Sequence, residues 1–474
     1  MIERSTMKKN LVALMIATVA PAASAQITGP SSSQSPYLLP SAGTVGVKTV
    51  SLLTVGDAPN GYRLAGIPDG MGAFKRAPEA RIFGLLVNHE LQPTAGAIHA
   101  HGSKGAFVSF WAVNPNDKSV FSGRDLITSV TTTGSSALGR LCSGDLAERT
   151  AYWPLVTPDG PEPFIFLSGE ETGAEGRAFA HVASGPDAQK SFELPYLGKY
   201  SWENALARPY PSPKTVVIGL DDSTPGQVYV YVGDKQPAGN VIQRAGLEGG
   251  VKYGIKVPSV PLEDRTTGIG SATRFEMANL GDVSTLTGAQ LQTASVTAGV
   301  TEFLRPEDGT WDPLNPRDFY FVTTDRFNTV TTVGRSRLWK LRFDDANDVT
   351  LGGDIFMLLD GTEGQQMFDN LCIDTRGHLM IQEDPGNQVH IAKVWQYDIA
   401  TDALTLLVEH DSARFIVGGA NFITQDEESS GIIDASRFLG KGWFIANVQA
   451  HAANPDPELV EFGQLVAIFN PASM

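Results

Sequence analysis

Apolar segments of this chain repeatedly end in acidic residues that a turn follows. The segments are LLVNHE, IFLSGEETG, VVIGLDD, LMIQEDPGN and FITQDEESSG, and their acidic positions are Glu90, Glu170, Glu171, Asp221, Asp222, Glu383, Asp384, Asp426, Glu427 and Glu428. Hard cations such as Ca²⁺ bind about six to eight oxygen atoms, which clustered carboxylates supply. Without a cation, carboxylates brought together raise one another's pKa values. A fold that gathers these segment ends would form a calcium site, whereas the alternative at any single position is an ordinary turn.

A second acidic segment, EFLRPEDGTWDP at residues 302–313, places Arg305 next to Glu307 and Asp308. Its two prolines and one glycine prevent a regular helix. One interpretation of this segment is a solvated turn. The other is a metal site with a neighbouring arginine, because a planar guanidinium binds anions through two parallel hydrogen bonds.

The elements that would position these residues are strands. Short segments such as GAFVSFWAV, GQVYVYVGD and GWFIANVQAH are rich in β-branched and aromatic residues and are bounded by Gly, Pro, Asp or Asn. Helical periodicity is confined to LTGAQLQTASVTAG, from Leu286. Roughly 450 residues of strand and turn without a break exceed a single sandwich. We therefore expect an all-β fold, a β-propeller with long inter-strand loops, because a propeller grows by radial repetition.

The N-terminus has the features of a cleaved export signal. Lys8 and Lys9 precede an apolar run from Leu11 to Val19, and Ala23 and Ala25 form the small-x-small pattern that a signal peptidase recognises. The run is too short to span a bilayer, and the Lys-Lys pair favours the general secretory route. We expect a signal peptide at 1–25, a flexible mature N-terminus at 26–44, one propeller domain at 45–474, and a periplasmic or secreted protein without an integral membrane segment.

Composition and missing motifs exclude several functions. The formal net charge of −16 is a poor match for nucleic acid, whose phosphates need Lys and Arg. Pro93 stands where a zinc-protease helix H-E-x-x-H would need its second histidine. The chain also contains no G-x-S-x-G elbow and no P-loop. Two cysteines, Cys142 and Cys372, are too few for a disulfide scaffold, although one disulfide between them is possible after export.

Six motifs occur in an order that resembles the PhoX-type alkaline phosphatase family. They are LLVNHEL…HGSKGAFVSFW, LCSGD…FLSGEETG, VVIGLDD…GQVYVYVG, RPED, FDNLCIDTRGHLMIQED and FIANVQAH, which together span nearly the whole mature chain. The resemblance implies a six-bladed propeller whose axial site holds iron and calcium ions and hydrolyses phosphate monoesters. It also implies a small-molecule phosphate ester as the partner, and we expect a monomer.

The resemblance further implies roles for individual residues. Arg305 of RPED resembles the arginine that binds phosphate, and Cys142 of LCSGD resembles a thiolate that binds iron; a buried inert thiol is the alternative. The further metal ligands that it implies are Glu170, Glu171, Glu203, Glu307 and Asp384. Residues with weaker support as ligands, or as groups that orient the ligands, are Glu90, Glu383, Glu427, Glu428, Asn447 and Gln449. A thiolate with carboxylates suits iron, and carboxylates alone suit calcium.

Two other functions fit the same expected scaffold. One is a different hydrolase, such as a phosphodiesterase or a lactonase, which a pocket without Arg305 near the metals would favour. The other is a calcium-stabilised propeller with a non-catalytic binding role, which carboxylates scattered around the rim would favour. Fold alone does not separate these functions from a phosphatase.

Overall fold

The computed structural model describes residues 24–75, 79–153, 162–264, 267–270, 272–325 and 334–474. Most of the expected signal peptide, residues 1–23, lies outside them. No helix in the described part of the chain is both long and apolar enough to cross a membrane. The expected helical segment is α2 (Gly288–Ala298), which begins with a capping box at Thr287.

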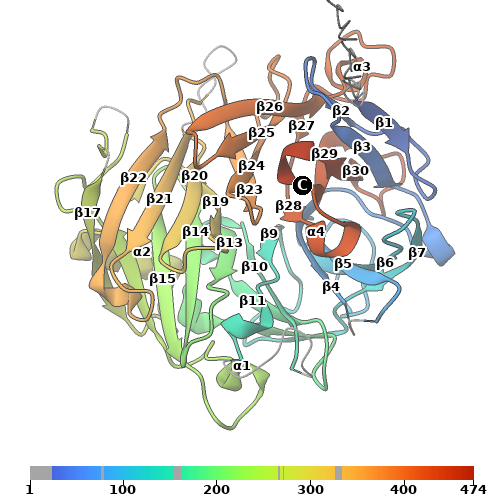
Figure 1. Cartoon of the computed structure of the whole chain (residues 1–474). Coiled ribbons are helices and arrows are strands. Elements are labelled where there is room, and N and C mark those ends of the chain that lie inside the picture. Colours follow the sequence, from blue (N-terminus) through green and yellow to red (C-terminus); the bar gives the residue numbers. More distant parts are fainter. Residues whose placement is uncertain (1–23, 76–78, 154–161, 265–266, 271, 326–333) are drawn as a thin grey trace, which may run out of the picture.

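The described strands pair into six antiparallel meanders of four strands, arranged around a common centre (Figure 1). Blade 1 comprises β4 (Pro68–Phe74), β5 (Phe83–His89), β6 (Phe107–Val113) and β7 (Val120–Asp125). Blade 2 comprises β9 (Leu141–Asp145), β10 (Ile165–Glu170), β11 (Ala178–Val182) and β12 (Lys190–Glu193), with β8 (Ser129–Thr131) beside β12. Blade 3 comprises β13 (Trp202–Ala207), β14 (Lys214–Asp221), β15 (Gly226–Asp234) and β16 (Val251–Lys256), with β17 (Thr273–Gly281) at its outer edge.

The other three blades follow the same order. Blade 4 comprises β19 (Pro306–Trp311), β20 (Asp318–Thr323), β21 (Arg337–Phe343) and β22 (Gly353–Leu359). Blade 5 comprises β23 (Phe368–Ile373), β24 (His378–Glu383), β25 (Lys393–Asp398) and β26 (Ala403–His410). Blade 6 comprises β28 (Ile432–Asp434), β29 (Trp443–Ala453), β30 (Glu461–Phe469) and β3 (Lys48–Thr54), with β27 (Glu427–Glu428) also on β29. The expected all-β propeller is confirmed.

The first strand of each blade faces the propeller axis. These inner strands are β4, β9, β13, β19, β23 and β28, and each contacts the inner strands of the two neighbouring blades. A pairing between β17 and β22 additionally joins blades 3 and 4 at their outer edges. The inner strands therefore form a closed ring, so that side chains at equivalent positions on different blades meet at the axis.

The ring is closed by pairing the two ends of the chain in blade 6. Strand β3 near the N-terminus lies antiparallel to β30 near the C-terminus, from Lys48 opposite Phe469 to Thr54 opposite Gln464. The segment 26–44, expected to be flexible, contributes strands on both sides of this junction: β1 (Ala25–Thr28) pairs with β3, and β2 (Leu38–Pro40) pairs with β26. Because β2 extends blade 5 and β1 extends blade 6, this segment fastens the two neighbouring blades together.

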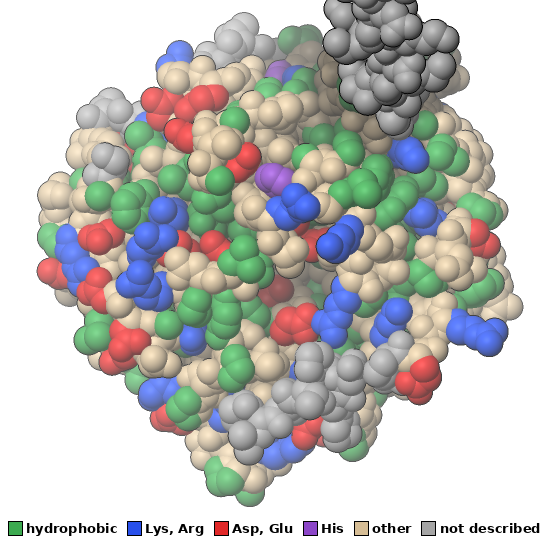
Figure 2. Space-filling model, in the orientation of Figure 1, with side chains coloured by type: hydrophobic (Ala, Val, Ile, Leu, Met, Phe, Trp, Pro, Cys, Tyr) green, Lys and Arg blue, Asp and Glu red, His purple; other side chains and the backbone are tan. Residues whose placement is uncertain are grey.

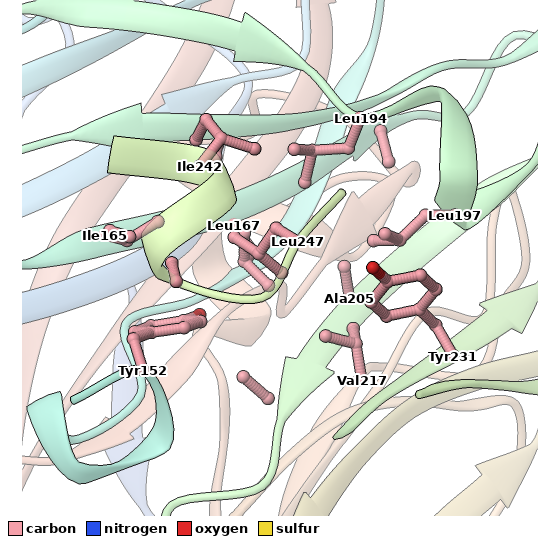
Figure 3. Packing of buried hydrophobic residues seen from close by; sticks show 14 of the residues in the cluster. Tyr152, Ile165, Leu167, Leu194, Leu197, Ala205, Val217, Tyr231, Ile242 and Leu247 are labelled. Atoms are coloured by element: carbon pink, nitrogen blue, oxygen red, sulfur yellow. The ribbon is translucent and has the colours of Figure 1, made fainter. Parts of the chain in front are cut away.

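Apolar side chains fill each gap between neighbouring blades. The six large clusters of buried apolar residues each combine residues from two adjacent blades. Figure 3 shows the cluster between blades 2 and 3, where Ile165 and Leu167 of β10 pack near Val217 of β14. Residues alternate along each strand, so Val217 enters this cluster while Val216 enters the next one. Both faces of a blade are therefore buried, which explains the continuous apolar runs in the sequence.

The same β-bulge occurs at the start of five inner strands. In β4, Pro68 lies opposite His89 and Met71 opposite Val87, so two residues of the inner strand face one residue of its partner. The equivalent extra residue occurs in β9, β13, β19 and β23. A bulge breaks the alternation of a strand and redirects side chains. The residues in the five bulges are Asp69-Gly70, Cys142-Ser143, Glu203-Asn204, Glu307-Asp308 and Asp369-Asn370.

A substitution at Gly70 tests how closely these bulges pack against one another. A Cβ at Gly70 would lie 2.1 Å from the backbone nitrogen of Gly144, on the adjacent inner strand. Because backbone atoms cannot move aside as a flexible side chain would, we expect Gly70→Ala to lower the free energy of unfolding by about 2 to 3 kcal/mol. The matched control is Gly268→Ala, at an exposed glycine with open space around its Cβ position. Equal denaturation midpoints for both variants would contradict the close packing of β4 on β9.

Candidate metal centre

The bulges place one donor from each of five blades at the axis. The donor is the second residue of the inner strand in every case: Asp69, Cys142, Glu203, Glu307 and Asp369. All five side chains are buried. The Sγ atom of Cys142 lies 3.1 Å from Oε2 of Glu203 and 3.4 Å from Oδ2 of Asp69, so neighbouring donors of this ring are close enough to share an ion.

A second ring of acidic residues comes from the ends of the second strands. Its residues immediately follow β5, β10, β14 and β24: they are Glu90, Glu171, Asp222 and Asp384. Each backbone N–H donates to the carbonyl of the residue that precedes the inner strand of its blade, at 2.8 to 2.9 Å. The recurring acidic segment ends of the sequence therefore do converge, and one carboxylate of each acidic pair faces the axis.

The donors form three groups whose ligand atoms lie within 4.8 Å of one another. The first group is Asp69, Glu90 and Cys142; the second is Glu203, Glu307 and Asp369; the third is Asp369, Asp384 and Glu428. Asp369 is shared, so the second and third groups are continuous. Two buried oxygens beside the first group, Oδ1 of Asp69 and Oε1 of Gln449, have no hydrogen-bond partner among the described residues. Buried oxygens without a donor are available to a cation.

Burial and mutual repulsion raise the pKa values of these carboxyl groups. Burial raises the pKa of Glu203 to about 8, and the nearby charge of Asp222 adds to this effect. The pKa of Glu428 rises to about 7, because of burial and then the charge of Asp384. Burial and the charge of Asp69 hold the pKa of the Cys142 thiol well above its usual value. Without bound cations, the site therefore retains protons near neutral pH.

Two arginines enter the site from equivalent positions on blades 2 and 4. The guanidinium of Arg305 lies 2.8 Å from Asp222 and 2.9 Å from Glu307. Arg140 lies 2.6 Å from Glu90 and also pairs with Glu171. Arg305, predicted from the sequence to bind phosphate, contacts one strand-end carboxylate and one member of the second donor group. Arg140 was not recognised.

Several predicted residues touch the donors from β29 and β27. Gln449 donates hydrogen bonds to Asp69 at 3.1 Å and to Glu90 at 3.2 Å. Asn447 donates to the backbone carbonyl of Asp69. Glu428, next to β29, belongs to the third donor group. The structure therefore brings together nine predicted residues: Glu90, Cys142, Glu171, Glu203, Glu307, Asp384, Glu428, Asn447 and Gln449.

Four predicted ligands lie outside the three groups: Glu170, Glu171, Glu383 and Glu427. Glu171 still reaches the second ring, where it pairs with Arg140, whereas the other three accept hydrogen bonds elsewhere. Glu170 accepts from the guanidinium of Arg177 at 2.6 Å and from the backbone N–H of Gly139 at 3.0 Å. Glu383 accepts from the indole of Trp395 at 2.8 Å. Glu427 accepts from a backbone N–H at 3.0 Å. Each immediately precedes the residue that does join the site, because successive residues of a strand point to opposite sides.

Sequence reasoning missed Asp69 and Asp369 as donors. Both are followed by a small or amide residue, Gly70 and Asn370, in the same way that Asn204 follows Glu203. Neither belongs to an acidic run, so the density of charge did not mark them. An alignment of the blade starts with one another would have revealed the shared acidic-then-small pattern.

A cavity of about 610 Å³ lies at the opposite end of the same inner strands. Its lining includes Asp145, Asp308 and Phe438, and α4 (Ser436–Leu439) borders it. Figure 2 shows this face of the molecule, which is hollowed near its middle. Asp308 is already hydrogen-bonded there by Asn204 at 2.6 Å. The donor groups thus lie at the start of the inner strands, away from this cavity.

Comparisons with known proteins agree with the sequence motifs. The family described as alkaline phosphatase PhoX matches residues 183–401, a little under half of the chain. The structure of Pseudomonas fluorescens PhoX in complex with vanadate, a transition state analogue, matches with a TM-score of 0.59 and 14% identity, over 92% of this chain and 98% of that one.

Other solved structures are less similar. A GH43 β-1,3-galactosidase matches with a TM-score of 0.34 and 12% identity, over 87% of this chain and 59% of that one. An α-L-arabinofuranosidase of Podospora anserina also gives 0.34, with 9% identity, over 89% of this chain and 96% of that one. No curated protein matches the sequence. The resemblance of this chain to the PhoX alkaline phosphatase family is therefore confirmed, by sequence over residues 183–401 and by fold over nearly its whole length.

Proposed function

We propose that this protein is an exported, metal-dependent phosphatase that hydrolyses phosphate monoesters at the propeller axis. The observation that carries the proposal is the excess of negative charge there. Nine carboxylates of the described chain surround the axis: Asp69, Glu90, Glu171, Glu203, Asp222, Glu307, Asp369, Asp384 and Glu428. Two arginines cannot neutralise them, and an anionic substrate would be repelled unless cations reverse the local field.

The chemistry of the donors indicates which cations would bind. The first group includes the thiol of Cys142 with two carboxylates, a set that suits iron. The second and third groups contain only carboxylates, which suit calcium. Hydrogen bonds orient the candidate metal ligands. Ser143 donates a hydrogen bond to Glu203 at 2.6 Å, and Thr324 donates one to Glu307 at 2.8 Å. Such supporting contacts commonly fix metal ligands in place.

Bound cations would lower the pKa of a bound water and stabilise charge on the transferring phosphoryl group. The protein itself would supply the guanidinium group that binds phosphate. Once cations bind Glu307 and Asp222, the guanidinium of Arg305 is free to form two parallel hydrogen bonds to phosphate oxygens. Pro306 follows Arg305 directly and restricts the backbone at this position.

The same features bear on the other candidate functions. A phosphodiesterase or lactonase would need no arginine at the metals, and a non-catalytic propeller would not need its carboxylates to converge. Arg305 contacts a member of the second donor group, which favours a phosphatase over both alternatives. We propose a small-molecule phosphate ester as the substrate, a periplasmic or secreted location, a monomer, and no nucleic-acid partner for so acidic a chain.

Metal content and turnover test this proposal together. Purified protein should contain calcium and iron in stoichiometric amounts, measured by elemental analysis. It should hydrolyse p-nitrophenyl phosphate at alkaline pH, and a chelator should abolish the activity, because the uncompensated carboxylates repel the substrate. Calcium without iron and without phosphatase activity would exclude the roles proposed for Cys142 and Arg305.

Replacing Arg305 by lysine separates the contribution of the positive charge from that of the two parallel hydrogen bonds. A lysine keeps the positive charge but cannot form the two parallel hydrogen bonds. We expect Arg305→Lys to lower kcat/KM for p-nitrophenyl phosphate about 100-fold, equivalent to about 2.7 kcal/mol of transition-state stabilisation. Arg342→Lys is the matched control, because Arg342 on the outer part of the same blade also pairs with one carboxylate, Asp318. An unchanged kcat/KM in Arg305→Lys would remove this residue from the proposed site.

The raised pKa values predict how the metal-free protein responds to pH. Glu203 and Glu428 have pKa values of about 8 and 7 in the folded protein, above those of unfolded carboxyl groups. Between about pH 5 and 8 the folded state therefore binds more protons than the unfolded state, so stability falls as pH rises. In chelator, the urea midpoint should fall over this range, whereas saturating Ca²⁺ should remove the decline. A midpoint in chelator that rises with pH would contradict this account.

A further inference from the structure

We propose that Arg140 is a second phosphate-binding arginine, which acts from the opposite flank of blade 3 to Arg305. The inference rests on the proposed function, because it concerns the substrate of the same site. It goes beyond the sequence motifs, in which only Arg305 has this role. Four observations carry it: position, backbone conformation, contacts and exposure.

The two arginines occupy the same place in their blades. Arg140 immediately precedes β9 and Arg305 immediately precedes β19. Both have positive φ angles, 37° for Arg140 and 57° for Arg305, in a region that non-glycine residues seldom adopt. Ile67 before β4 and Met367 before β23 have the same conformation, with φ angles of 50° and 51°, so it is a feature of the blade start that the two arginines share. The same backbone conformation, immediately before the inner strand, therefore directs both side chains toward the axis.

The contacts of the two guanidinium groups also correspond. Arg140 pairs with Glu90, which belongs to the first donor group, and with Glu171 of the second ring. Arg305 pairs with Glu307, which belongs to the second donor group, and with Asp222 of the second ring. Each arginine thus bonds one metal-ligand candidate and one strand-end carboxylate. Cations that bind these carboxylates would release both guanidinium groups in the same way.

The two arginines come from the blades on either side of blade 3, since Arg140 precedes β9 and Arg305 precedes β19. Cys142, two residues after Arg140, lies 3.1 Å from Glu203 of blade 3, and Glu203 shares a donor group with Glu307, two residues after Arg305. Arg140 and Arg305 therefore lie on the two sides of Glu203, the donor of blade 3.

Arg140 is accessible to a ligand. Its side chain is 36% exposed, whereas that of Arg305 is 20% exposed. The pKa of Arg140 is raised, first by the charge of Glu90, so the guanidinium is always protonated. A phosphate ester has several oxygens that accept hydrogen bonds, and one fork cannot satisfy all of them. The guanidinium group of Arg140 would bind the phosphate oxygens that face away from Arg305.

Direct binding of inorganic phosphate to the metal-loaded protein tests this role. Titration calorimetry should give a Kd about tenfold weaker for Arg140→Lys and about 100-fold weaker for Arg140→Gln, since hydrogen bonds to charged groups are worth about 1.5–3 kcal/mol. The KM for p-nitrophenyl phosphate should rise in parallel. Arg177→Lys is the matched control: Arg177 pairs with Glu170, next to Glu171, and its other hydrogen bonds include the backbone carbonyls of Ser135 and Ala137. It should bind phosphate as the wild type does.

Elemental analysis of each variant separates phosphate binding from a structural role. If Arg140 only balanced the charge of Glu90 and Glu171, Arg140→Lys would keep its metals and bind phosphate with the wild-type Kd, which would overturn the inference. If Arg140→Gln loses metal, its weaker phosphate binding has a second cause. The Kd of Arg140→Lys, compared with that of the wild type, then tests the inference. A wild type that binds phosphate but hydrolyses no monoester would refute the proposed function, while weaker binding in Arg140→Lys would still support the inference.

Discussion

Mutual repulsion between carboxylates at the propeller axis is the interaction on which the rest of this structure depends. Buried carboxylates such as Asp69, Glu307 and Asp369 have raised pKa values because burial and like charges disfavour ionisation. A flexible scaffold would separate them. Here six apolar clusters between blades, together with closure of the ring by β3 and β30, prevent the inner strands from moving apart. The apolar packing thus holds the groups at a separation that only bound cations or protons make favourable.

The repeated bulge directs the candidate metal ligands of five inner strands toward the propeller axis. In a regular strand, consecutive side chains point to opposite faces, so only one of each pair could reach the axis. With the bulge, Glu203 faces the donors while Asn204 hydrogen-bonds Asp308 of the next blade, in a layer beneath them. Asn370 likewise donates to Ser143. The bulges therefore supply both the candidate metal ligands and part of the polar layer that supports them.

The sequence predicted the fold class and many of the residues that meet at the axis, and its limits have a physical cause. Apolar runs that end in acidic residues predicted strand ends, the number of strands and the chain length predicted the propeller, and the order of motifs predicted the resemblance to the PhoX family. Pairs such as Glu170-Glu171 could not be resolved into one inward and one outward carboxylate, because the direction of a side chain depends on register. Asp69 and Asp369 were missed since a bulge is a property of two paired strands. The partner of Glu170, Arg177, immediately precedes the next strand of the same blade, β11, and became evident only from the paired structure.

Positive charge is distributed around the axis with the same regularity as negative charge. Each of the three donor groups is contacted by one cationic side chain of the described residues: Arg140 at Glu90, Arg305 at Glu307, and His451 at Glu428. Burial lowers the pKa of His451, but its hydrogen bonds to Glu428 and Glu461 outweigh this effect and raise it well above the usual value. The three cations come from blades 2, 4 and 6, so they alternate around the ring. His451 also contacts Glu461, which keeps it at blade 6, whereas both arginines bond only carboxylates that face the site. The two arginines are therefore the cations that metal binding would free for an anionic substrate.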